Sequence, residues 1–444
     1  MAPPKFILTA TAFPICKWRW DIYPARVSIL EELKWRGLIA DCTDTAELTK
    51  KVSSPITLYC GFDPTADSLH AGNLVPLLAL RRFQLLGHHP IAVAGGATGS
   101  IGDPSGKTQE RQLLTKEVLG SNIARVKLQL AKLLDFETKQ NPARLLDNAS
   151  WTENIPFLDF LRDIGKHFSV NQMAAKESVR ARMEDRDTGI SYTEFSYMLL
   201  QAFDFFVLMR DYNCELQIGG SDQWGNITAG IDLSRKKLGK TVYGLTLPLI
   251  TNADGTKFGK TEAGAIWLDS QRTSEKDFFQ FWMRTDDRDV ERYLKFFTFL
   301  SENEIAAIVS EHQKSPEKRV AQRELAKSVT TLIHGANVAK READAIDAYS
   351  GKISGAQLLD HFPKKEFPKA GLAGEGTALV ELMVHAGLAT SKSQARQLIT
   401  GGGVEVNGER ITDANRKITV ADIRHEKFIQ LQKGKKTHVL IVPV

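Results

Sequence analysis

Two short segments, far apart in the sequence, combine residue types that bind phosphate groups. The first is His70–Asn73 (His-Ala-Gly-Asn), which follows the apolar run Thr57–Phe62. We expect a helix to begin near Gly72. Its free main-chain amides, the positive end of its dipole and two polar side chains would together form a nucleotide site. The second is Lys257–Thr261, in which two lysines flank a glycine. Such a loop can bring ammonium groups to a triphosphate, although each motif alone also fits an ordinary helix cap or an exposed turn.

A third group of polar residues has the spacing of one helix face. Tyr197, Gln201 and Asp204 follow one another at intervals of four and three residues among apolar neighbours. This pattern indicates a polar wall in an otherwise apolar pocket, and a stripe facing solvent is the alternative. Further along, a glycine pair at 219–220 would let a ribose or an adenine approach the main chain, and Asp222 could accept hydrogen bonds from ribose hydroxyls.

The glycine-rich segment Gly95–Thr108 resembles a phosphate-binding loop but lacks both familiar spacings. Neither the nucleotide-triphosphatase pattern nor the dinucleotide-binding pattern of glycines is present. The sequence therefore indicates neither an ordinary ATPase nor a dehydrogenase. It predicts a glycine-lined strand end that carries Asp103, followed by a loop with Lys107 and Arg111, and a flexible surface loop is the alternative.

The elements that would position these residues alternate along the chain from Ser28 to about Arg272. Apolar strands are predicted at Thr57–Phe62 and at 90–96, and leucines at helical spacing lie between them from Leu74 to Leu85. Strand, helix and strand in this order predict an α/β fold with a parallel sheet. Ligands of such a sheet bind at the carboxyl ends of its strands.

After residue 272 the chain is predicted to contain a helical region, a linker and a final segment of helices and strands. From 273 to 350 the sequence is poor in strand signals, and helices are predicted at 274–283, 289–299, 302–311, 316–334 and 339–349. The proline- and glycine-rich residues 351–376 predict a linker. The last segment, 377–444, predicts helices at 378–386 and 391–400 and a hairpin that turns at Asn407-Gly408.

Composition and charge narrow the class of protein. The chain has 444 residues, of which 42% are hydrophobic and 25% charged, as in ordinary globular proteins. No apolar run approaches the roughly 20 residues that span a bilayer, and the four cysteines lie too far apart to predict a disulfide framework or a thiolate zinc site. Residues 377–444 carry ten Lys or Arg and six acids, nearly all of the net charge of +5. This basic segment predicts a polyanionic partner.

Together, these motifs resemble those of the bacterial and organellar tyrosyl-tRNA synthetases, in the class I aminoacyl-tRNA synthetase superfamily. His70–Asn73 corresponds to the His-Ile-Gly-His signature, and Lys257–Thr261 to the Lys-Met-Ser-Lys-Ser signature. The segments Gly-Gly-Ser-Asp-Gln-Trp-Gly-Asn at 219–226 and Gly-Gly-Ala-Thr-Gly at 95–99 are specific to the tyrosyl group and its tryptophanyl relatives. Asn73 replaces the second histidine but retains a side-chain donor.

The resemblance implies an architecture of several domains. It implies an N-terminal extension at 1–27, a Rossmann-like catalytic domain with a parallel sheet at 28–272, an α-helical anticodon-recognition domain at 273–350, a linker at 351–376 and a small α+β RNA-binding domain of ribosomal-protein type at 377–444. It also implies a homodimer in the cytoplasm. The mitochondrial matrix is the alternative if residues 1–27 are a targeting segment.

The resemblance also implies the reaction. Tyrosine and ATP would form tyrosyl-adenylate and pyrophosphate, and the tyrosine would then be transferred to the 3′ end of tRNA(Tyr). No permanently bound cofactor or protein-held metal is expected. ATP is a substrate, and Mg²⁺ would arrive with it.

Residue by residue, the resemblance implies three overlapping groups. The residues that would face the phosphates or close over pyrophosphate are Thr65, His70, Asn73, Lys107, Arg111, Lys257 and Lys260. The residues that would bind tyrosine are Tyr59, Asp103, Tyr197, Gln201, Asp204 and Gln223. Those that would bind ATP are Gly61, Asp63, His70, Asn73, Gly220, Asp222, Lys257, Phe258, Gly259, Lys260 and Thr261. Within the tyrosine group, Tyr59 and Asp204 would contact the phenol hydroxyl.

Three alternatives remain open at this point. A tryptophanyl-tRNA synthetase would share both signatures, but Tyr59 together with Asp204 suits a phenol better than an indole. A nucleotidyltransferase could use the same helix start, although the lysine loop and the basic C-terminal segment count against it. An RNA chaperone or splicing cofactor could be built on the same fold, and the presence of His70, Asp204 and Lys257 favours catalysis without excluding that second role.

Overall fold

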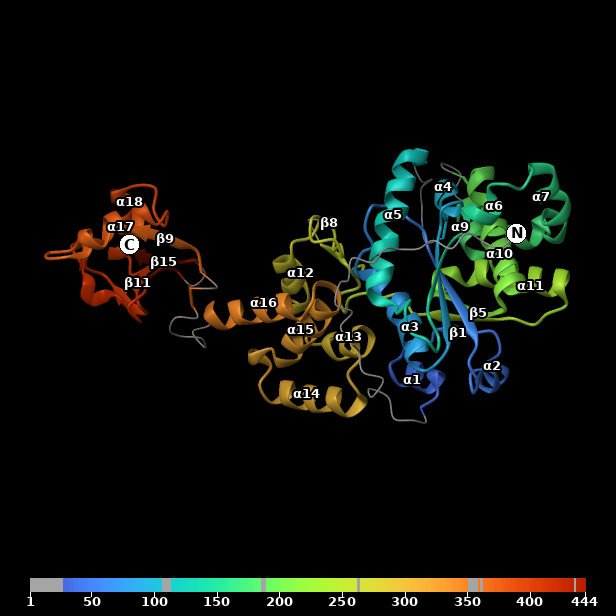
Figure 1. The fold of residues 1–444 in the computed structure, drawn as a ribbon, viewed down its shortest axis with the longest axis horizontal. Coiled ribbons are helices and arrows are strands. Elements are labelled where there is room, and N and C mark those ends of the chain that lie inside the picture. The colour runs from blue at the N-terminus through green and yellow to red at the C-terminus, as the bar shows by residue number, and fades with distance from the viewer. Residues whose placement is uncertain are drawn as a thin grey trace. The chain divides into compact units, whose positions relative to one another are not determined.

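The computed structural model describes residues 27–105, 113–184, 189–261, 264–349, 358–359, 362–434 and 437–444. The predictions for Lys107, Arg111 and the N-terminal extension up to residue 26 lie outside these described residues, as does the side chain of Thr261. The chain divides into two compact units, and the first ends at Gly335 where the second begins at Ala336. Figure 1 shows the helices and strands of both units.

A six-stranded sheet forms the centre of the first unit. Its strands, in spatial order, are β1 (Asp41–Cys42), β6 (Tyr243–Leu247), β5 (Cys214–Gly220), β2 (Thr57–Phe62), β3 (His89–Ala94) and β4 (Arg144–Asp147). All neighbouring strands are parallel except the edge pair β1 and β6. The central strands are nearly continuous apolar runs because both faces of the sheet are covered. The predicted α/β fold with a parallel sheet is confirmed.

The order of the strands reverses between β2 and β5, the position at which we expect a ligand. From β2 the chain moves outward through β3 and β4, and it then returns to the other side of β2 to add β5 and β6. The carboxyl ends of the strands on either side of such a reversal leave a crevice, where open α/β sheets bind their ligands. Tyr59 on β2 and the glycine pair that ends β5 therefore lie at the same edge.

Helices cover both faces of this sheet. In Figure 1, α3 and α5 lie on one side of the strands and α10 and α11 on the other. The bounds of these helices are α3 Leu74–Leu85, α5 Lys116–Leu133, α10 Tyr192–Tyr212 and α11 Trp224–Leu238. Side chains of α10 pack on β2 and β3 in one buried cluster that contains Tyr59, Ile91 and Phe205.

The long helix α10 is fixed at both its start and its middle. The hydroxyl of Ser191 accepts a hydrogen bond from the main-chain amide of Glu194 at 3.2 Å, which caps the helix. The carboxylate of Glu194 forms a buried ion pair with Arg182 at 3.0 Å. Further along, a β-carbon added to Gly230 of α11 would lie 2.9 Å from the β-carbon of Phe205. A larger residue there would push the two helices apart.

The other elements of the first unit are mostly short. Its remaining α-helices are α1 Ile29–Trp35, α2 Thr45–Lys51, α4 Thr98–Ile101, α6 Ala149–Thr152, α7 Phe157–Asp163, α8 Val170–Ala174, α9 Glu177–Glu184, α12 Glu275–Met283, α13 Val290–Phe297, α14 Glu302–Lys314 and α15 Val320–His334. Its 3₁₀ helices are η2 Ala71–Asn73, η3 Gly165–His167, η4 Ser221–Gln223 and η5 Pro316–Lys318, and a small hairpin joins β7 Lys260–Thr261 to β8 Gly264–Ala265.

The helices predicted after residue 273 all form, but the first four do not make a separate unit. Helices α12 to α15 belong to the same compact unit as the sheet. Two buried arginines from the sheet region, Arg36 and Arg82, donate hydrogen bonds to main-chain carbonyls at the end of α13. The fifth helix, α16 (Ala336–Tyr349), belongs to the second unit.

In the second unit, α16 is followed by a five-stranded sheet and two shorter helices. The strands of this sheet, in spatial order, are β12 (Glu409–Ile411), β11 (Val404–Val406), β14 (Ile429–Lys433), β15 (Thr437–Pro443) and β9 (Lys364–Phe367). Its other elements are η7 Lys369–Leu372, β10 Thr377–Ala378, α17 Leu379–His385, α18 Lys392–Thr400, β13 Lys417–Ile418 and η8 Val420–Asp422.

The hairpin predicted at Asn407-Gly408 forms, whereas part of the predicted linker forms the strand β9. Asn407 and Gly408 both have positive φ angles, 53° and 84°, as the tight hairpin turn requires. The predicted linker 351–376 is wrong in its second half, because β9 pairs with β15 and the side chain of Leu372 is buried in the core of this unit. The prolines at 363 and 368 bound that edge strand, and their density suggested a linker.

Among the residues that the structure describes, the helices are each too short or too polar to cross a bilayer.

Candidate active site

The first feature of the crevice is a buried phenol hydroxyl. The side chain of Tyr59 is 1% exposed, and its ring packs against that of Phe205 with centroids 5.3 Å apart. Its hydroxyl has no hydrogen-bond partner among the described residues. Burial and then the nearby charge of Asp204 raise the pKa of Tyr59 well above its ordinary value. A buried donor beside a carboxylate is suited to a ligand that brings its own hydroxyl.

The carboxylate of Asp204 is buried and held by two donors. The indole nitrogen of Trp151 donates to Oδ1 at 2.8 Å, and Nδ2 of Asn148 donates to Oδ2 at 2.9 Å. Burial raises the pKa of Asp204 to about 7, against the opposing effect of these two hydrogen bonds. The spacing in the sequence therefore placed Tyr197 and Asp204 correctly on a buried helix face, and the alternative of a solvent-facing stripe is wrong for both.

Asn148 and Trp151 were not among the predicted site residues. Asn148 follows β4 directly and precedes the short helix α6, and Trp151 lies within that helix. No motif marks this segment, but it begins where a parallel strand ends. That position was the signal that could have identified Asn148, because such strand ends line the crevice.

A chain of hydrogen bonds connects Asp204 to the nucleotide side of the crevice. Asn148 also donates from Nδ2 to Oγ1 of Thr98 at 2.9 Å, and the hydroxyl of Thr98 donates to Oδ1 of Asp63 at 2.7 Å. The hydroxyl of Tyr197 donates to the other oxygen of Asp63 at 2.7 Å. Asp63 and Tyr197, expected to contact different substrates, are thus bonded to each other.

The glycines at the end of β3 make room for carboxylates. A β-carbon on Gly95 would lie 2.0 Å from Oδ1 of Asp63, and one on Gly96 would lie 2.2 Å from Oδ1 of Asp147. The predicted glycine-lined strand end is therefore present, and its glycines allow acidic side chains to approach the main chain.

A second polar cluster joins three of the predicted tyrosine-binding residues. Nε2 of Gln223 donates to Oδ2 of Asp103 at 2.6 Å. Nδ2 of Asn226 donates to Oε1 of Gln201 at 3.1 Å and to Oε1 of Gln223 at 3.2 Å. Asp103, Gln201 and Gln223 come from three separate segments, so the fold brings them together as the resemblance implies. Asn226, which links them, was not among the predicted residues.

The His70–Asn73 turn forms a helix start, close to the predicted position. The amide of Gly72 donates to Nδ1 of His70 at 3.1 Å, and the amide of His70 donates to Oδ1 of Asn73 at 3.0 Å. The 3₁₀ helix η2 follows, and α3 begins at Leu74. His70 therefore acts as a cap in this structure, and its exposed side chain lies at the mouth of the crevice.

The lysine loop lies against this turn. Gly259 has a φ of 75°, and a β-carbon there would lie 3.6 Å from the amide nitrogen of Gly72. The two segments are also joined through Ile266, whose amide donates to the carbonyl of Gly259 at 2.9 Å and whose carbonyl accepts from the amide of Ala71 at 2.8 Å. The fold thus brings the two phosphate-binding motifs side by side.

The two lysines of the loop are exposed. Lys257 and Lys260 lie on the solvent side of the loop. Burial and then the charge of Asp103 raise the pKa of Asp222, and the ammonium group of Lys257 acts in the opposite direction. Lys257 therefore acts electrostatically on Asp222, the residue predicted to bind the ribose at the end of β5.

The burial of Phe258 limits how this residue could contact a nucleotide. Its side chain is buried, with its ring 5.0 Å from that of Tyr293 and 5.1 Å from that of Phe297. Any contact between Phe258 and a nucleotide would therefore be made by its main chain. The side chain anchors the lysine loop in the aromatic core of the neighbouring helices.

The remaining predicted nucleotide residues lie around the open edge. Thr65 is exposed two residues after Asp63, and Gly61 is exposed on β2, with no atom within 4 Å of an added β-carbon. At the end of β5, a β-carbon on Gly220 would lie 2.5 Å from Oδ1 of Asp222. Gly220 therefore allows the carboxylate of Asp222 to fold back over the strand end.

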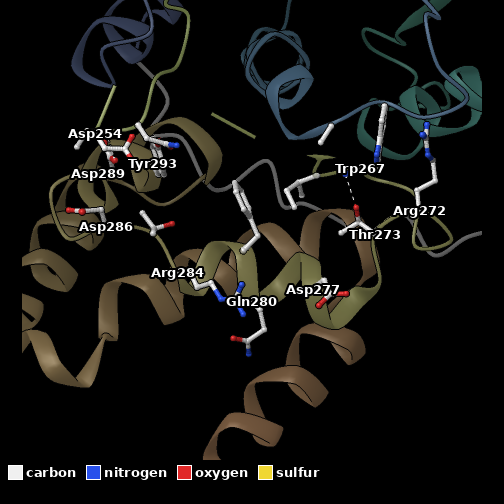
Figure 2. Close-up of a pocket in the computed structure, with 16 residues that line it drawn as sticks. Asp254, Trp267, Arg272, Thr273, Asp277, Gln280, Arg284, Asp286, Asp289 and Tyr293 are labelled. Carbon is white, nitrogen blue, oxygen red and sulfur yellow. Dashed lines mark hydrogen bonds between the residues drawn. The ribbon is translucent and has the colours of Figure 1, made fainter. Parts of the chain in front are cut away.

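A cavity of about 720 Å³ lies beside the lysine loop (Figure 2). Its lining comes from residues 252–254, from 265–273 and from α12 and α13. It includes none of the predicted tyrosine-binding residues. The convergent polar groups and the perturbed pKa of Asp204 place the candidate active site at the strand ends instead.

Two family models match this chain. Residues 50–349 match class I tRNA synthetases for tryptophan and tyrosine, and residues 357–441 match a tyrosine–tRNA ligase SYY-like C-terminal domain. The tyrosine–tRNA ligase of Opitutus terrae is 55% identical over 423 residues, which cover 94% of this chain and 99% of that protein. This chain belongs to the tyrosyl-tRNA synthetase family.

Other relatives agree with this assignment. The tyrosine–tRNA ligase of Bacillus caldotenax is 52% identical over 421 residues, which cover 94% of this chain and 99% of that protein. The crystal structure of a C-terminally truncated mitochondrial tyrosyl-tRNA synthetase from Aspergillus nidulans superposes with a TM-score of 0.67 at 33% identity, covering 73% of this chain and 94% of that one. Membership of the tyrosyl group, together with the Tyr59 and Asp204 pair, argues against the tryptophanyl alternative.

The raised pKa of Asp204 predicts how stability depends on pH. The folded protein holds the proton more tightly than the unfolded chain, so the stabilising effect of protonated Asp204 is complete at low pH and is lost as the pH rises from about 4 to about 7. Relative to Asp204→Asn, the wild type should lose on the order of 2–4 kcal/mol of unfolding free energy across that range. Urea unfolding of both proteins between pH 5 and pH 8 measures most of this difference.

The exposed residue Asp211 provides a matched control. Asp211→Asn should unfold with the same pH dependence as the wild type. Parallel curves for the wild type and Asp204→Asn would contradict the assignment of the raised pKa to Asp204.

Proposed function

We propose that this chain activates L-tyrosine with ATP and transfers the tyrosine to the 3′ end of tRNA(Tyr). The observation that carries this proposal is the buried hydroxyl of Tyr59 beside the carboxylate of Asp204, at the base of the crevice that the two phosphate-binding motifs border. A substrate phenol would donate a hydrogen bond to Asp204 and accept one from Tyr59. Phenylalanine would leave the Tyr59 hydroxyl unpaired, at a cost of about 1–3 kcal/mol for a buried group, and would offer no donor to Asp204.

The first step requires positioning more than proton transfer. The ionised carboxylate of tyrosine attacks the α-phosphorus of ATP, a new phosphorus–oxygen bond forms, and the bond to pyrophosphate breaks. No general base is needed, so the barrier falls through alignment of the reactants and stabilisation of phosphate charge. We assign the phosphate contacts to Thr65, His70, Asn73, Lys257 and Lys260. By resemblance, we add Lys107 and Arg111.

The remaining tyrosine contacts follow from the second polar cluster. Asp103 and Gln201 would bind the ammonium group together with Tyr197, and Gln223 would lie near the carboxylate. The hydrogen bonds that join Gln223 to Asp103 and to Asn226 support this assignment, because they hold the amide in a fixed orientation. Gly61, Asp63, Gly220, Asp222 and the main chain of the lysine loop would contact the nucleotide. Mg²⁺ would arrive with ATP.

For tRNA, we propose two contact regions. The basic segment 377–444 would bind the phosphates of structured RNA, which makes affinity fall as salt rises. The helices predicted at 273–350 would help to recognise the anticodon. We propose the cytoplasm as the place of this activity, because the curated relatives reported above are bacterial tyrosine–tRNA ligases.

We further propose that the protein works as a homodimer. Several large apolar side chains between α7 and the start of α10 are exposed, namely Phe157, Leu158, Val170 and Tyr192. An exposed apolar group of this size is typical of a protein interface. The label α7 in Figure 1 marks where the first two of these residues lie.

Charge introduced into this surface should separate the subunits. We expect the double variant Phe157→Asp, Leu158→Asp to sediment as a monomer at micromolar concentration, where the wild type sediments as a dimer. Val420→Asp changes an exposed apolar residue of the second unit and should leave the dimer intact. A monomeric wild type, or a dimeric double variant with the wild-type circular dichroism spectrum, would contradict the proposal.

The reaction itself is tested by exchange of labelled pyrophosphate into ATP with each of the twenty amino acids. We expect exchange with tyrosine far above all others, and charging of tRNA(Tyr) by the same preparation. The double variant Lys257→Ala, Lys260→Ala should bind tyrosine normally and lose exchange, because its lysines act on the phosphates. Exchange with tryptophan only, exchange without any amino acid, or no exchange would each overturn the proposed function.

A further inference from the structure

We propose that helix α13 is a strut that fixes the distance between the lysine loop and the His70–Asn73 turn, with Asp289, Tyr293 and Arg82 as positioning residues. Residues at one end of α13 bind the base of the loop. Residues at its other end bind the helix α3 that begins at the turn. The catalytic consequence of this inference rests on the proposed function, but the physical linkage does not.

The N-terminal end of α13 is hydrogen-bonded to residues 251–253, which precede the lysine loop and form its base; we call these contacts the latch. The carboxylate of Asp289, which precedes the helix, accepts a hydrogen bond from the amide of Ala253 at 2.7 Å. The hydroxyl of Tyr293 donates to Oδ1 of Asn252 at 2.8 Å. Arg292 donates to the carbonyl of the preceding loop residue, Thr251, at 2.5 Å. Residues 251–253, which precede the lysine loop, are therefore hydrogen-bonded to the N-terminal end of α13.

Figure 2 shows where two residues of this latch lie relative to the neighbouring cavity. Asp289 and Tyr293 lie together beside Asp254 at one end of the cavity, away from Trp267 and Arg272 at the other end. The side chain of Asp289 is nearly fully buried, although it carries a charge. Its hydrogen bonds to Ala253 and Arg292 satisfy that buried carboxylate.

The same helix also holds the middle of the loop. The ring of Phe258, which follows Lys257 directly, packs against Tyr293 and stacks on Phe297 at the last residue of α13. Tyr293 thus contacts the loop twice, through its hydroxyl at the base and through its ring near the first lysine. A shift of α13 would carry Lys257 with it.

At its C-terminal end, α13 accepts hydrogen bonds from two buried arginines. Arg82 donates from Nη2 to the carbonyls of Phe296 at 3.0 Å and Thr298 at 2.8 Å. Arg36 donates from Nη1 to the carbonyls of Lys295 at 2.8 Å and Thr298 at 3.1 Å. The last carbonyls of a helix have no partner within the helix, and their partial negative charge attracts cations. The arginines therefore fix this end in place.

These contacts close a ring of rigid elements. Arg82 lies on α3, and α3 begins directly after the His70–Asn73 turn. The ring runs from that turn along α3 to Arg82, through α13 to the lysine loop, and back through Gly259 to Gly72. Because a misplacement of about 1 Å can cost on the order of a hundredfold in rate, we infer that this ring sets how closely the lysines approach the departing pyrophosphate.

The test removes single polar groups from the latch in the full chain. Tyr293→Phe and Asp289→Asn keep the size of each side chain, and Tyr212→Phe removes a hydroxyl from the far end of α10 as a matched control. We expect kcat for tyrosine-dependent pyrophosphate exchange to fall about tenfold or more in each latch variant. The KM for tyrosine should stay at the wild-type value, because the Tyr59 and Asp204 pocket lies apart from the loop.

A second measurement does not depend on activity. Lys257 and Lys260 are exposed, so trypsin can cut the loop once the loop loosens. We expect faster cleavage at these two lysines in both latch variants than in Tyr212→Phe or the wild type, with unchanged thermal unfolding temperatures. Unchanged cleavage and unchanged kcat would overturn the strut. The strut would also be overturned if the latch variants showed a lower kcat, a higher KM for tyrosine and a lower unfolding temperature together. That pattern indicates general loss of structure.

The two proposals fail in different ways. A wild type that shows no tyrosine-dependent exchange contradicts the proposed function, and the cleavage measurement still decides the strut. A wild type that exchanges with tyrosine, with latch variants that match it in kcat and in cleavage, contradicts only the strut.

Discussion

The structure depends most on a buried carboxylate kept next to a buried phenol hydroxyl. Removing an ionisable group from water costs free energy unless other groups compensate it. Asn148 and Trp151 each donate a hydrogen bond to Asp204, yet burial still raises its pKa to about 7. Tyr59 beside it has no partner for its hydroxyl among the described residues. Among the described residues, the Tyr59 hydroxyl is thus left available for the substrate phenol that we propose.

Much of the surrounding fold serves to keep that arrangement in place. Helix α10, which carries Asp204, begins at a hydroxyl cap and a buried ion pair, and it packs closely on α11 because of Gly230. Strand β2, which carries Tyr59, has parallel neighbours on both sides. The chain of hydrogen bonds through Thr98 and Asp63 then connects this pocket to a residue predicted to bind the nucleotide. The groups proposed for tyrosine and those proposed for ATP therefore belong to one network of hydrogen bonds.

The two halves of the site differ in exposure, as their tasks require. The groups assigned to the amino acid are largely buried, where an unpaired polar group is costly and discrimination is strong. The groups assigned to the phosphates, including His70 and both lysines of the loop, are exposed. The positions of these exposed groups must be set by neighbouring elements. In our proposal, α13 does this through its contacts with the lysine loop and with the buried side chains of Arg36 and Arg82.

The sequence predicted those features that local patterns determine. Helix starts, the Asn407-Gly408 turn and the buried helix face of Tyr197 and Asp204 all follow from spacing and backbone preference. Asn148, Trp151 and Asn226 were missed because their roles arise only when distant segments meet. The burial of the Phe258 side chain could not be predicted, because a signature motif says which residues stand together in sequence and not which way each side chain points. Strand β9 was missed because its flanking prolines resemble those of a linker.

The central claim is that Tyr59 and Asp204 together bind a phenol hydroxyl. Equilibrium titration of tyrosine and of phenylalanine into the wild type and Tyr59→Phe, without ATP, tests it most directly. The account predicts that Tyr59→Phe binds tyrosine about tenfold or more weakly, as the loss of a buried hydrogen bond implies, and binds phenylalanine at least as well as the wild type. Equal tyrosine affinity in the two proteins would contradict the account.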